Sequence, residues 1–237
     1  MHPSSATHVN LVGRSETHLC SAEAGDVLGA RVHRDVVAPF YDLRTAARGQ
    51  GYELAVLSGF RSFDRQLSIW NRKVRGELPV LDSSGHPLDV RALSERDLVL
   101  AILRWSALPG ASRHHWGTDV DIYDKAATPA GYEVELIPSE VDPGGIFGPL
   151  HQWLDARIAS GEAMGFFRPY DVDRGGVAPE RWHLSYAPLA STYAAMLTPE
   201  LLRQTLEGTD ILLKDVVLQL LPTIFERFVI NTNPGFL

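Results

Sequence analysis

The sequence predicts an α+β fold in which helices surround a small sheet. Short strand patterns and longer helical patterns follow one another in mixed order, without the regular alternation that a parallel βα repeat requires. The composition, 45% hydrophobic and 22% charged, is typical of a globular chain with a sizeable core. We expect an irregular lead-in over residues 1–25 and one domain over residues 26–237, C-terminal helices included, because a chain of 237 residues gives only weak support for two domains.

The first half of the chain carries clear helix and strand patterns. Ser62 and Ser94 are typical helix N-caps, and Gly49 and Gly51 are expected to end the first helix. The predicted elements are a helix at 27–48, a buried strand at 52–59, a helix at 62–73, an exposed loop at 76–91 and a helix at about 95–107.

The second half alternates loops with further elements. We expect Pro222 to break the last helix, because proline lacks the backbone donor that a helix interior needs. The apolar C-terminal segment predicts a packed helical pair, with a dimer surface as the alternative. The predicted elements are a strand at 117–124, a loop or hairpin at 129–149, a helix at 149–163, a loop after 165, a short strand at 182–186 and helices at 190–197, 199–207 and 210–229.

Charge and terminal sequence restrict the partners. The net charge of −7 and the pI near 5.7 argue against a nucleic-acid backbone, which requires a basic face. The single cysteine, Cys20, cannot form an internal disulfide and is expected to be inert. No secretion signal and no apolar run of about 20 residues is visible. We therefore expect a cytoplasmic protein if this N-terminus is native, with the periplasm or cell envelope as the alternative.

Two stretches, SRHHWGTDVD (112–121) and PERWHLSY (179–186), each place histidine close to a carboxylate. Zinc sites in hydrolases use three protein ligands and leave one position for water, and a nearby carboxylate serves as general base. His114, Asp121, Glu180 and His183 supply those residue types. The alternative is two pieces of ordinary core, in which the histidines are hydrogen-bonded and the aspartates cap a strand end.

The spacing allows a shared face in the first stretch. Residues two apart on a strand point the same way, so Asp119 and Asp121 are expected on one face. Gly117 lets the chain turn before the strand. Strand parity therefore cannot decide whether His114 or His115 points to the face of Asp119 and Asp121.

In the second stretch, Glu180 and His183 are three residues apart and would face opposite sides of a regular strand. Pro179 favours a loop around Glu180, which lets its side chain swing to the side of His183. His183 and Ser185 are expected to share one face of the following strand.

These motifs, with SGFRSFDRQ (58–66) upstream, resemble those of the zinc D-alanyl-D-alanine carboxypeptidases of the VanY type, a group related to VanX-like dipeptidases and to the hedgehog fold. The pattern is Ser112-x-His114-x-x-Gly117-x-x-x-Asp121, followed by Glu180-x-Trp182-His183. All three motifs occur in the family's order, and the resemblance extends from about residue 25 to about residue 230. It implies a small antiparallel sheet that carries the zinc site and is wrapped by helices.

The resemblance also implies a role for each matching residue. His114, Asp121 and His183 match the ligands of one zinc ion, and Glu180 matches the catalytic base. Arg61 matches the arginine that binds the substrate's carboxylate or steadies the developing oxyanion. The remaining matches are to the substrate pocket: Ser112 and Gln66.

Four neighbouring residues have open roles. Trp182 and Trp116 flank the ligands and are expected either to wall the substrate pocket or to lie in the core. Arg113 and His115 are expected at solvent-exposed edges of the site.

One departure from the family concerns Asp119. The family usually has alanine two residues before the aspartate ligand. The extra carboxylate is expected either to support a metal ligand from outside the coordination sphere or to point into solvent after a bulge.

The implied activity is hydrolysis of the peptide bond before a C-terminal D-alanine of peptidoglycan stem peptides or their precursors, by a D,D- or an L,D-carboxypeptidase. The loops at 76–91 and 129–149 are expected to decide the specificity. The alternatives are an endopeptidase of the phage-lysin kind, a plain dipeptidase and a metal-bearing binding module without catalysis.

Overall fold

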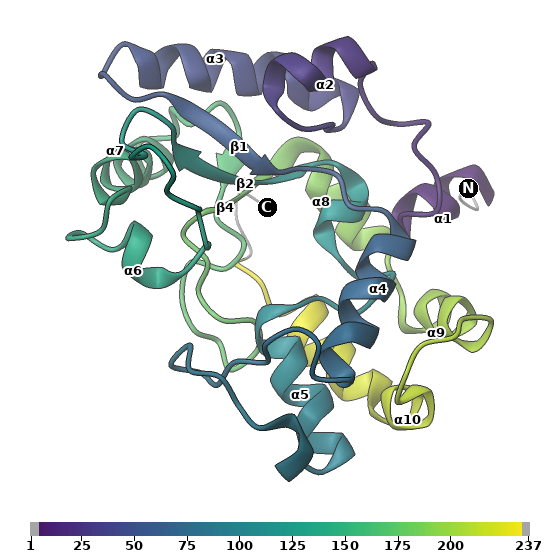
Figure 1. Ribbon diagram of the computed structural model, residues 1–237. Helices are drawn as coiled ribbons and strands as arrows, with labels where there is room; N and C mark the ends of the chain where they lie inside the picture. Colours follow the sequence, from purple (N-terminus) through teal and green to yellow (C-terminus); the bar gives the residue numbers. More distant parts are fainter. Residues whose placement is uncertain (1–4, 234–237) are drawn as a thin grey trace.

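The computed structural model, in which residues 5–233 are described, contains a four-stranded antiparallel sheet surrounded by helices (Figure 1). Adjacent strands are antiparallel throughout, in the order β1-β2-β4-β3. This confirms the predicted α+β class. The strands are β1 (Leu54–Ser58), β2 (Asp119–Asp124), β3 (Phe166–Phe167) and β4 (His183–Tyr186). The two-residue strand β3 was expected to be a loop, because so short a strand leaves no periodic pattern.

Helices make up most of the remaining described residues. Ser62 and Ser94 accept hydrogen bonds from Arg65 N and Asp97 N, so both predicted N-caps are confirmed. The helices are α1 (Ser5–Leu11), α2 (Ala22–Leu28), α3 (Val37–Arg48), α4 (Phe63–Val74), α5 (Glu95–Trp105), α6 (Pro138–Val141), α7 (Gly148–Ala159), α8 (Ala187–Met196), α9 (Pro199–Glu207) and α10 (Lys214–Ile224). Shorter helical turns are η1 (Arg34–Val36), η2 (Val90–Ala92), η3 (Arg113–Trp116) and the π-helical η4 (Phe225–Val229).

The N-terminal part departs from the prediction. The expected irregular lead-in over residues 1–25 contains α1 and the start of α2, and Leu11 is fully buried in the core. The single helix expected over residues 27–48 is wrong in its first part. Gly29 adopts a left-handed φ of 90° that ends α2, and the long helix α3 begins only at Val37. Helices of seven residues are too short to show two full turns of apolar periodicity.

Pro222 lies within α10 and does not end it. The carbonyl of Leu218, which cannot receive a backbone hydrogen bond from Pro222, accepts one from Arg203 Nη2 at 3.2 Å. The helical path continues into the π-helical turn of η4, a common adjustment near a missing helical bond. The expected break is therefore wrong, whereas the expected packing of this segment into the core is confirmed by its buried residues Leu221, Ile224 and Phe228.

The sheet separates an apolar core from a polar face. Val120, Ile122 and Leu184 alternate along β2 and β4 and lie in a buried cluster with residues of α3 and α7. The intervening residues, among them Asp119 and Asp121, point to the opposite face. In Figure 1, α4, α5, α9 and α10 lie on the side of the molecule away from α2 and α3, and they build a second apolar cluster. The polar face of the sheet is thus directed toward the space between two cores.

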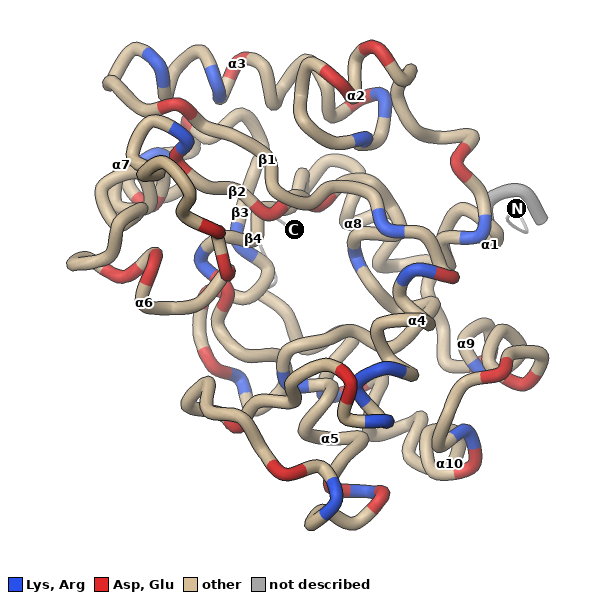
Figure 2. The backbone as a smooth tube through the Cα atoms, in the orientation of Figure 1, with Lys and Arg blue, Asp and Glu red and all other residues tan. Residues whose placement is uncertain are grey.

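Charged residues of both signs alternate over the helices and loops in Figure 2, without a continuous basic strip in that view. Among the described residues, no helix combines the length and apolar character required to cross a membrane. The lone Cys20 is buried, as expected of an inert cysteine.

Candidate active site

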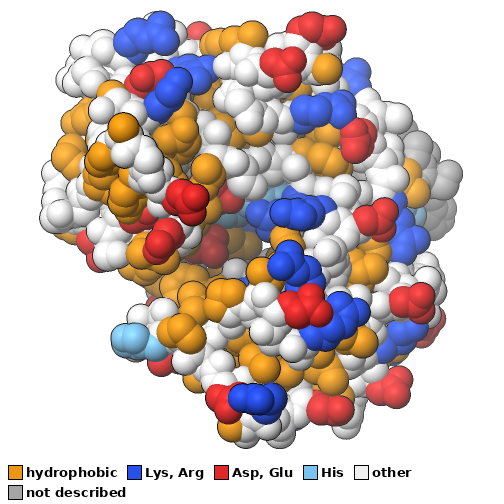
Figure 3. Space-filling model, viewed as in Figure 1, with side chains coloured by type: hydrophobic (Ala, Val, Ile, Leu, Met, Phe, Trp, Pro, Cys, Tyr) orange, Lys and Arg blue, Asp and Glu red, His pale blue; other side chains and the backbone are white. Residues whose placement is uncertain are grey.

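A cavity of about 260 Å³ opens on the polar face of the sheet. Figure 3 shows the molecule hollowed between the half that carries α2, α3 and the sheet and the half that carries α4 and α5, with histidine surface visible inside. The residues that line the cavity include Arg61, Lys73, Leu81, Trp105, Ser112, His114, Asp121, Glu135, Leu136, Ile137, Tyr170, Glu180, Trp182 and His183. Both stretches singled out in the sequence therefore contribute to one cavity.

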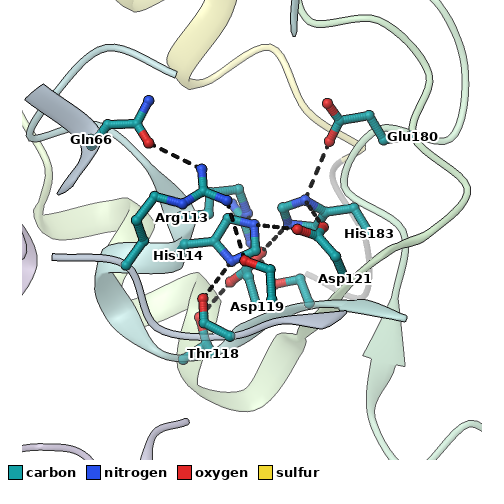
Figure 4. Close-up of polar contacts among 12 residues, drawn as sticks. Gln66, Arg113, His114, Thr118, Asp119, Asp121, Glu180 and His183 are labelled. Atoms are coloured by element: carbon teal, nitrogen blue, oxygen red, sulfur yellow. Dashed lines mark hydrogen bonds and ion pairs between the residues drawn. The ribbon is translucent and has the colours of Figure 1, made fainter. Parts of the chain in front are cut away.

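His114, Asp121 and His183 form a group that could hold a metal ion. One candidate ligand atom from each lies within 4.8 Å of the others, and all three residues are buried. His114 Nε2 is 3.3 Å from Asp121 Oδ2, and His183 Nδ1 is 3.5 Å from Asp121 Oδ1. Figure 4 shows the three side chains directed toward one another. Of the two interpretations that the sequence left open, the geometry supports one shared site.

The strand register produces this convergence. Asp121 on β2 lies directly opposite His183 on β4, and Asp119 lies opposite Ser185. Because side chains alternate along each strand, all four point to the polar face, as their spacing predicted.

A tight turn brings His114 to the same place. Gly117 has a left-handed φ of 67°, and a Cβ there would come within 2.7 Å of the His33 backbone nitrogen. Glycine thus allows η3 to turn directly into β2. His115 faces away from the site: its Nδ1 lies 2.6 Å from the Arg61 carbonyl, and its Nε2 accepts from Gly110 N at 3.1 Å.

Charges inside the group shift its pKa values in opposite directions. Burial raises the pKa of Asp121, but His114 and the charges of His183 and Arg61 outweigh burial and hold that pKa below its ordinary value. Burial lowers the pKa of His183, yet Asp119, Glu180 and Asp121 raise it to about 10. Because a metal ligand must be deprotonated, these carboxylates make metal binding at His183 compete with proton binding.

Glu180 joins the group from the loop before β4, as Pro179 predicted. Its Oε2 lies 3.3 Å from His183 Nδ1, and its side chain is 13% exposed in the cavity. The backbone fixes this position, because Glu180 N donates to the Tyr170 carbonyl at 2.9 Å and His183 N donates to the Glu180 carbonyl at 3.1 Å.

Arg61 lines the cavity, and hydrogen bonds to two neighbouring side chains hold its guanidinium in place. Its Nη1 donates to Gln66 Oε1 at 3.0 Å, and its Nη2 donates to Ser58 Oγ at 3.2 Å. Gln66 is completely buried, also donates to the Ala107 carbonyl, and is not among the residues that line the cavity. Gln66 was expected to line the pocket, but it lies behind Arg61. It orients the Arg61 side chain, which does line the pocket.

The two tryptophans have different positions. Trp182 lines the cavity, and so does Ser112. Trp116 is buried in the core, where it donates to the Leu11 carbonyl and stacks on Tyr193 at 5.8 Å. Of the two, only Trp182 is placed to contact a substrate.

Asp119 is buried and does not point into solvent. Its Oδ1 accepts from Arg113 Nε at 2.8 Å and lies 2.9 Å from His183 Nε2. The Arg113 guanidinium and the bond from His183 outweigh burial and keep the pKa of Asp119 well below its usual range. The exposed edge positions expected for Arg113 and His115 are wrong, since their exposed fractions are 6% and 0%. Arg113 is needed inside as the counter-ion of Asp119.

Sequence reasoning missed three contributors to the cavity. Lys73 lines it from α4, and burial lowers its pKa. Tyr170 packs edge-on against the His183 ring at 5.1 Å. Glu140, on α6, accepts from the Tyr132 hydroxyl and from backbone N–H groups of residues 135–137, which form part of the cavity wall. Carboxylates with strand periodicity, such as Asp119 and Asp121 in β2, could be found in the sequence. Lys73 and Tyr170 reach the cavity through contacts between distant segments, and Glu140 acts within a loop that has no periodic pattern.

Comparison with known proteins gives a consistent result. A family model described as VanY, D-alanyl-D-alanine carboxypeptidase, matches residues 29–189. A protein of Haemophilus influenzae described only as uncharacterised is 36% identical over 124 residues, which are 52% of this chain and 93% of that protein. A D-alanyl-D-alanine carboxypeptidase of Enterococcus faecalis is 29% identical over 161 residues, which are 67% of this chain and 49% of that enzyme.

Among solved structures, VanYB in complex with D-alanine-D-alanine has a similar fold. Its TM-score is 0.50 at 22% identity, and the match covers 83% of this chain and 92% of that one. The family model spans all the candidate site residues from Arg61 to His183. The chain therefore belongs to the VanY family of D-alanyl-D-alanine carboxypeptidases, and it is a metallopeptidase of that type.

Proposed function

We propose that the protein is a zinc-dependent carboxypeptidase that removes the C-terminal D-alanine from peptidoglycan stem peptides or their precursors. The observation that carries this proposal is one cavity in which His114, Asp121 and His183 converge beside Glu180 and Arg61. Ligands, acid–base group and cation are the parts that metal-assisted peptide hydrolysis needs.

The donor set fits a zinc ion. Two imidazole nitrogens and one carboxylate are typical ligands of catalytic zinc, which keeps a further position open. His114 Nδ1 lies 2.8 Å from the Gly59 carbonyl, which leaves Nε2 available toward Asp121. We propose His114, Asp121 and His183 as the three ligands.

Glu180 is the proposed general base. When bound, zinc lowers the pKa of water from about 15.7 toward about 7 and favours negative charge on the scissile carbonyl oxygen. The Glu180 carboxylate lies at the edge of the ligand group and faces the cavity, where it can take the proton of the attacking water. The same side chain can then return that proton to the leaving amine.

Arg61 is proposed as the cationic side chain that binds the substrate. Gln66 and Ser58 each accept from one of its terminal nitrogens, so the guanidinium is fixed in orientation before substrate arrives. A fixed guanidinium can bind a carboxylate through two parallel hydrogen bonds or stabilise a developing oxyanion. Either role requires the substrate's reacting end to lie between Arg61 and the metal ligands.

The size of the cavity supports a small substrate group. At about 260 Å³ it falls below the range of about 300–1,000 Å³ that encloses drug-sized ligands. The end of a peptide with small side chains, such as a terminal D-alanine, is compatible with that space. Ser112 and Trp182 are the proposed contacts on its walls.

The test is direct. Zinc-loaded protein is incubated with muropeptide tetrapeptide and pentapeptide, with and without a chelator, and the products are identified by mass spectrometry. Chelator-sensitive loss of one alanine is the expected result, and the substrate that shortens distinguishes an L,D- from a D,D-carboxypeptidase. Cleavage inside the stem would instead identify an endopeptidase, and metal binding without cleavage would identify a binding module.

A further inference from the structure

We propose that Asp119 is a positioning residue for the metal centre, which fixes the ring of His183 with Nδ1 toward the metal and is held by Arg113. The inference rests on the proposed metal site but concerns a residue outside its ligand set. Its starting point is the 2.9 Å contact between Asp119 Oδ1 and His183 Nε2, with Asp119 completely buried.

The two histidines of the group are held by different acceptors. His114 Nδ1 lies 2.8 Å from the Gly59 carbonyl oxygen, which can only accept, so this ring presents Nε2 to the site. His183 donates through Nε2 to the Asp119 carboxylate and presents Nδ1 instead. A rotated His183 ring would turn Nδ1 away from Asp121 and lose this bond. Asp119 therefore determines which nitrogen of His183 is available to a metal.

The carboxylate is itself held in place by three donors. Besides His183, Arg113 Nε donates to Oδ1 at 2.8 Å and Thr118 Oγ1 donates to Oδ2 at 2.6 Å. Arg113 Nη2 also donates to Ser185 Oγ at 2.7 Å, and Ser185 lies opposite Asp119 in the β2–β4 register. A buried network in which each member has partners is rigid, and rigidity is what a ligand support requires.

Arg113 balances the additional negative charge. Its guanidinium packs against the Trp116 ring at 4.8 Å, and the residue is only 6% exposed. Asp119 and Arg113 together are neutral, so the pair orients His183 without changing the net charge of the centre. The carboxylate–histidine support thus adds a fixed, buried neighbour to the three proposed ligands.

The test measures metal binding, not peptide cleavage. Zinc affinity is determined by competition with a chelator, and the visible spectrum of the Co²⁺-loaded protein reports ligand geometry. Asp119→Ala is expected to weaken zinc binding about 10–100-fold and to change the Co²⁺ spectrum. Asp119→Asn is expected to lose less, because its amide oxygen can still accept from His183. Asp124→Asn is the matched control, since Asp124 is a buried, hydrogen-bonded carboxylate on the same strand but on the opposite face.

Asp119→Ala also leaves Arg113 buried without its counter-ion, which could weaken folding by itself. The double variant Asp119→Ala/Arg113→Leu separates the two effects. We expect its thermal unfolding to return toward that of the wild type, while zinc binding stays weak because His183 Nε2 still lacks its acceptor.

Two results would overturn the inference alone: wild-type zinc affinity in Asp119→Ala, or wild-type affinity restored in the double variant. Wild-type protein that binds no metal would overturn the proposed function as well, so the two failures are distinguishable.

Discussion

The carboxylate of Glu180 lies 3.3 Å from Nδ1 of His183, the same ring nitrogen that faces Asp121 at 3.5 Å. This contact places an acid–base group at the edge of the metal-binding group and inside the cavity. Glu180 is partly exposed there, whereas the three proposed ligands are buried. A role in proton transfer and a role in metal binding are therefore separable by mutation.

Glu180→Gln is expected to lower kcat by about 10²–10⁴-fold, the usual contribution of general acid–base catalysis. Zinc affinity should change little, because His114, Asp121 and His183 remain. Steady-state kinetics on the cleaved muropeptide and chelator competition measure the two quantities. Glu135→Gln, another carboxylate on the cavity lining, is the control. A Glu180→Gln enzyme with wild-type kcat would show that the proton passes through another group.

Local spacing predicted part of the ligand group, and the family resemblance supplied the choice of His114 over His115. Asp119 and Asp121 share a face through strand parity, and Pro179 placed Glu180 in a loop. The partner of Asp119 could not be predicted, because it depends on how η3, β2 and β4 meet. A sequence pattern predicts the face of a strand to which a side chain points, but it does not predict which distant side chain contacts it there.

Arg61→Lys is expected to lower kcat/KM by about tenfold or more, since a charge-assisted contact is worth roughly 1.5–3 kcal/mol. Lysine keeps the charge but cannot be held by Gln66 and Ser58 while it contacts the substrate with a second nitrogen. Arg65→Lys, at an exposed position on α4, is the matched control. Equal kcat/KM values for Arg61→Lys and the wild type would remove Arg61 from substrate recognition.

Lys73 supplies a second cation to the cavity, and among the described residues it has no ion-pair partner. Lys73→Met is expected to raise KM about tenfold for a peptide with a free C-terminal carboxylate, because a partly buried ammonium without a counter-ion favours a bound anion. KM for the same peptide with a C-terminal amide should not change. Arg72→Met, which removes a neighbour paired with Glu77 at 3.6 Å, controls for loss of charge on α4. An equal effect of Lys73→Met on both peptides would refute the prediction.

The outline of the fold followed from caps and periodicity, but short elements did not. Ser62 and Ser94 gave two helices their correct starts, whereas α1, α2 and β3 were missed. These three form where the surrounding core supplies the stability that their own length cannot. The segment 135–137 in the cavity wall was missed for the same reason, because it is too short to show a pattern in the sequence.

Glu140→Gln is expected to raise KM by about tenfold and to leave kcat nearly unchanged. The Glu140 carboxylate accepts from the Tyr132 hydroxyl at 2.8 Å and from Leu136 N at 2.8 Å, and Leu136 adopts an uncommon left-handed φ of 58°. An amide offers one acceptor oxygen where the carboxylate offers two, so the segment loses part of its support. Tyr132→Phe, which removes one of these bonds, should have a smaller effect. Unchanged KM in Glu140→Gln would show that the segment does not contribute to substrate binding.

Stability should fall in mild acid, and His18 is one of the histidines that contribute to this fall. Its ring is 5% exposed, lies 5.7 Å from the His33 ring and is surrounded by Tyr193, Phe60 and the charges of Arg31 and Arg34. Burial and the neighbouring His33 lower the pKa of His18 to about 4. The unfolded chain takes up this proton near pH 6.5. Between these values the unfolded state binds more protons, so this contribution to stability is complete above pH 6.5 and decreases as the pH falls toward 4.

The variant His18→Gln tests the acid sensitivity, because glutamine can donate to the His115 carbonyl, 3.2 Å from His18 Nε2, without titrating. The free energy of unfolding is measured by urea denaturation at pH 7.5 and pH 5, with a chelator present so that metal binding does not contribute. We expect the decrease between the two pH values to be smaller in His18→Gln than in the wild type. His86→Gln, in the loop with a side chain 78% exposed, should leave the decrease unchanged. Identical pH dependence in all three proteins would mean that His18 is not the group whose protonation opposes folding.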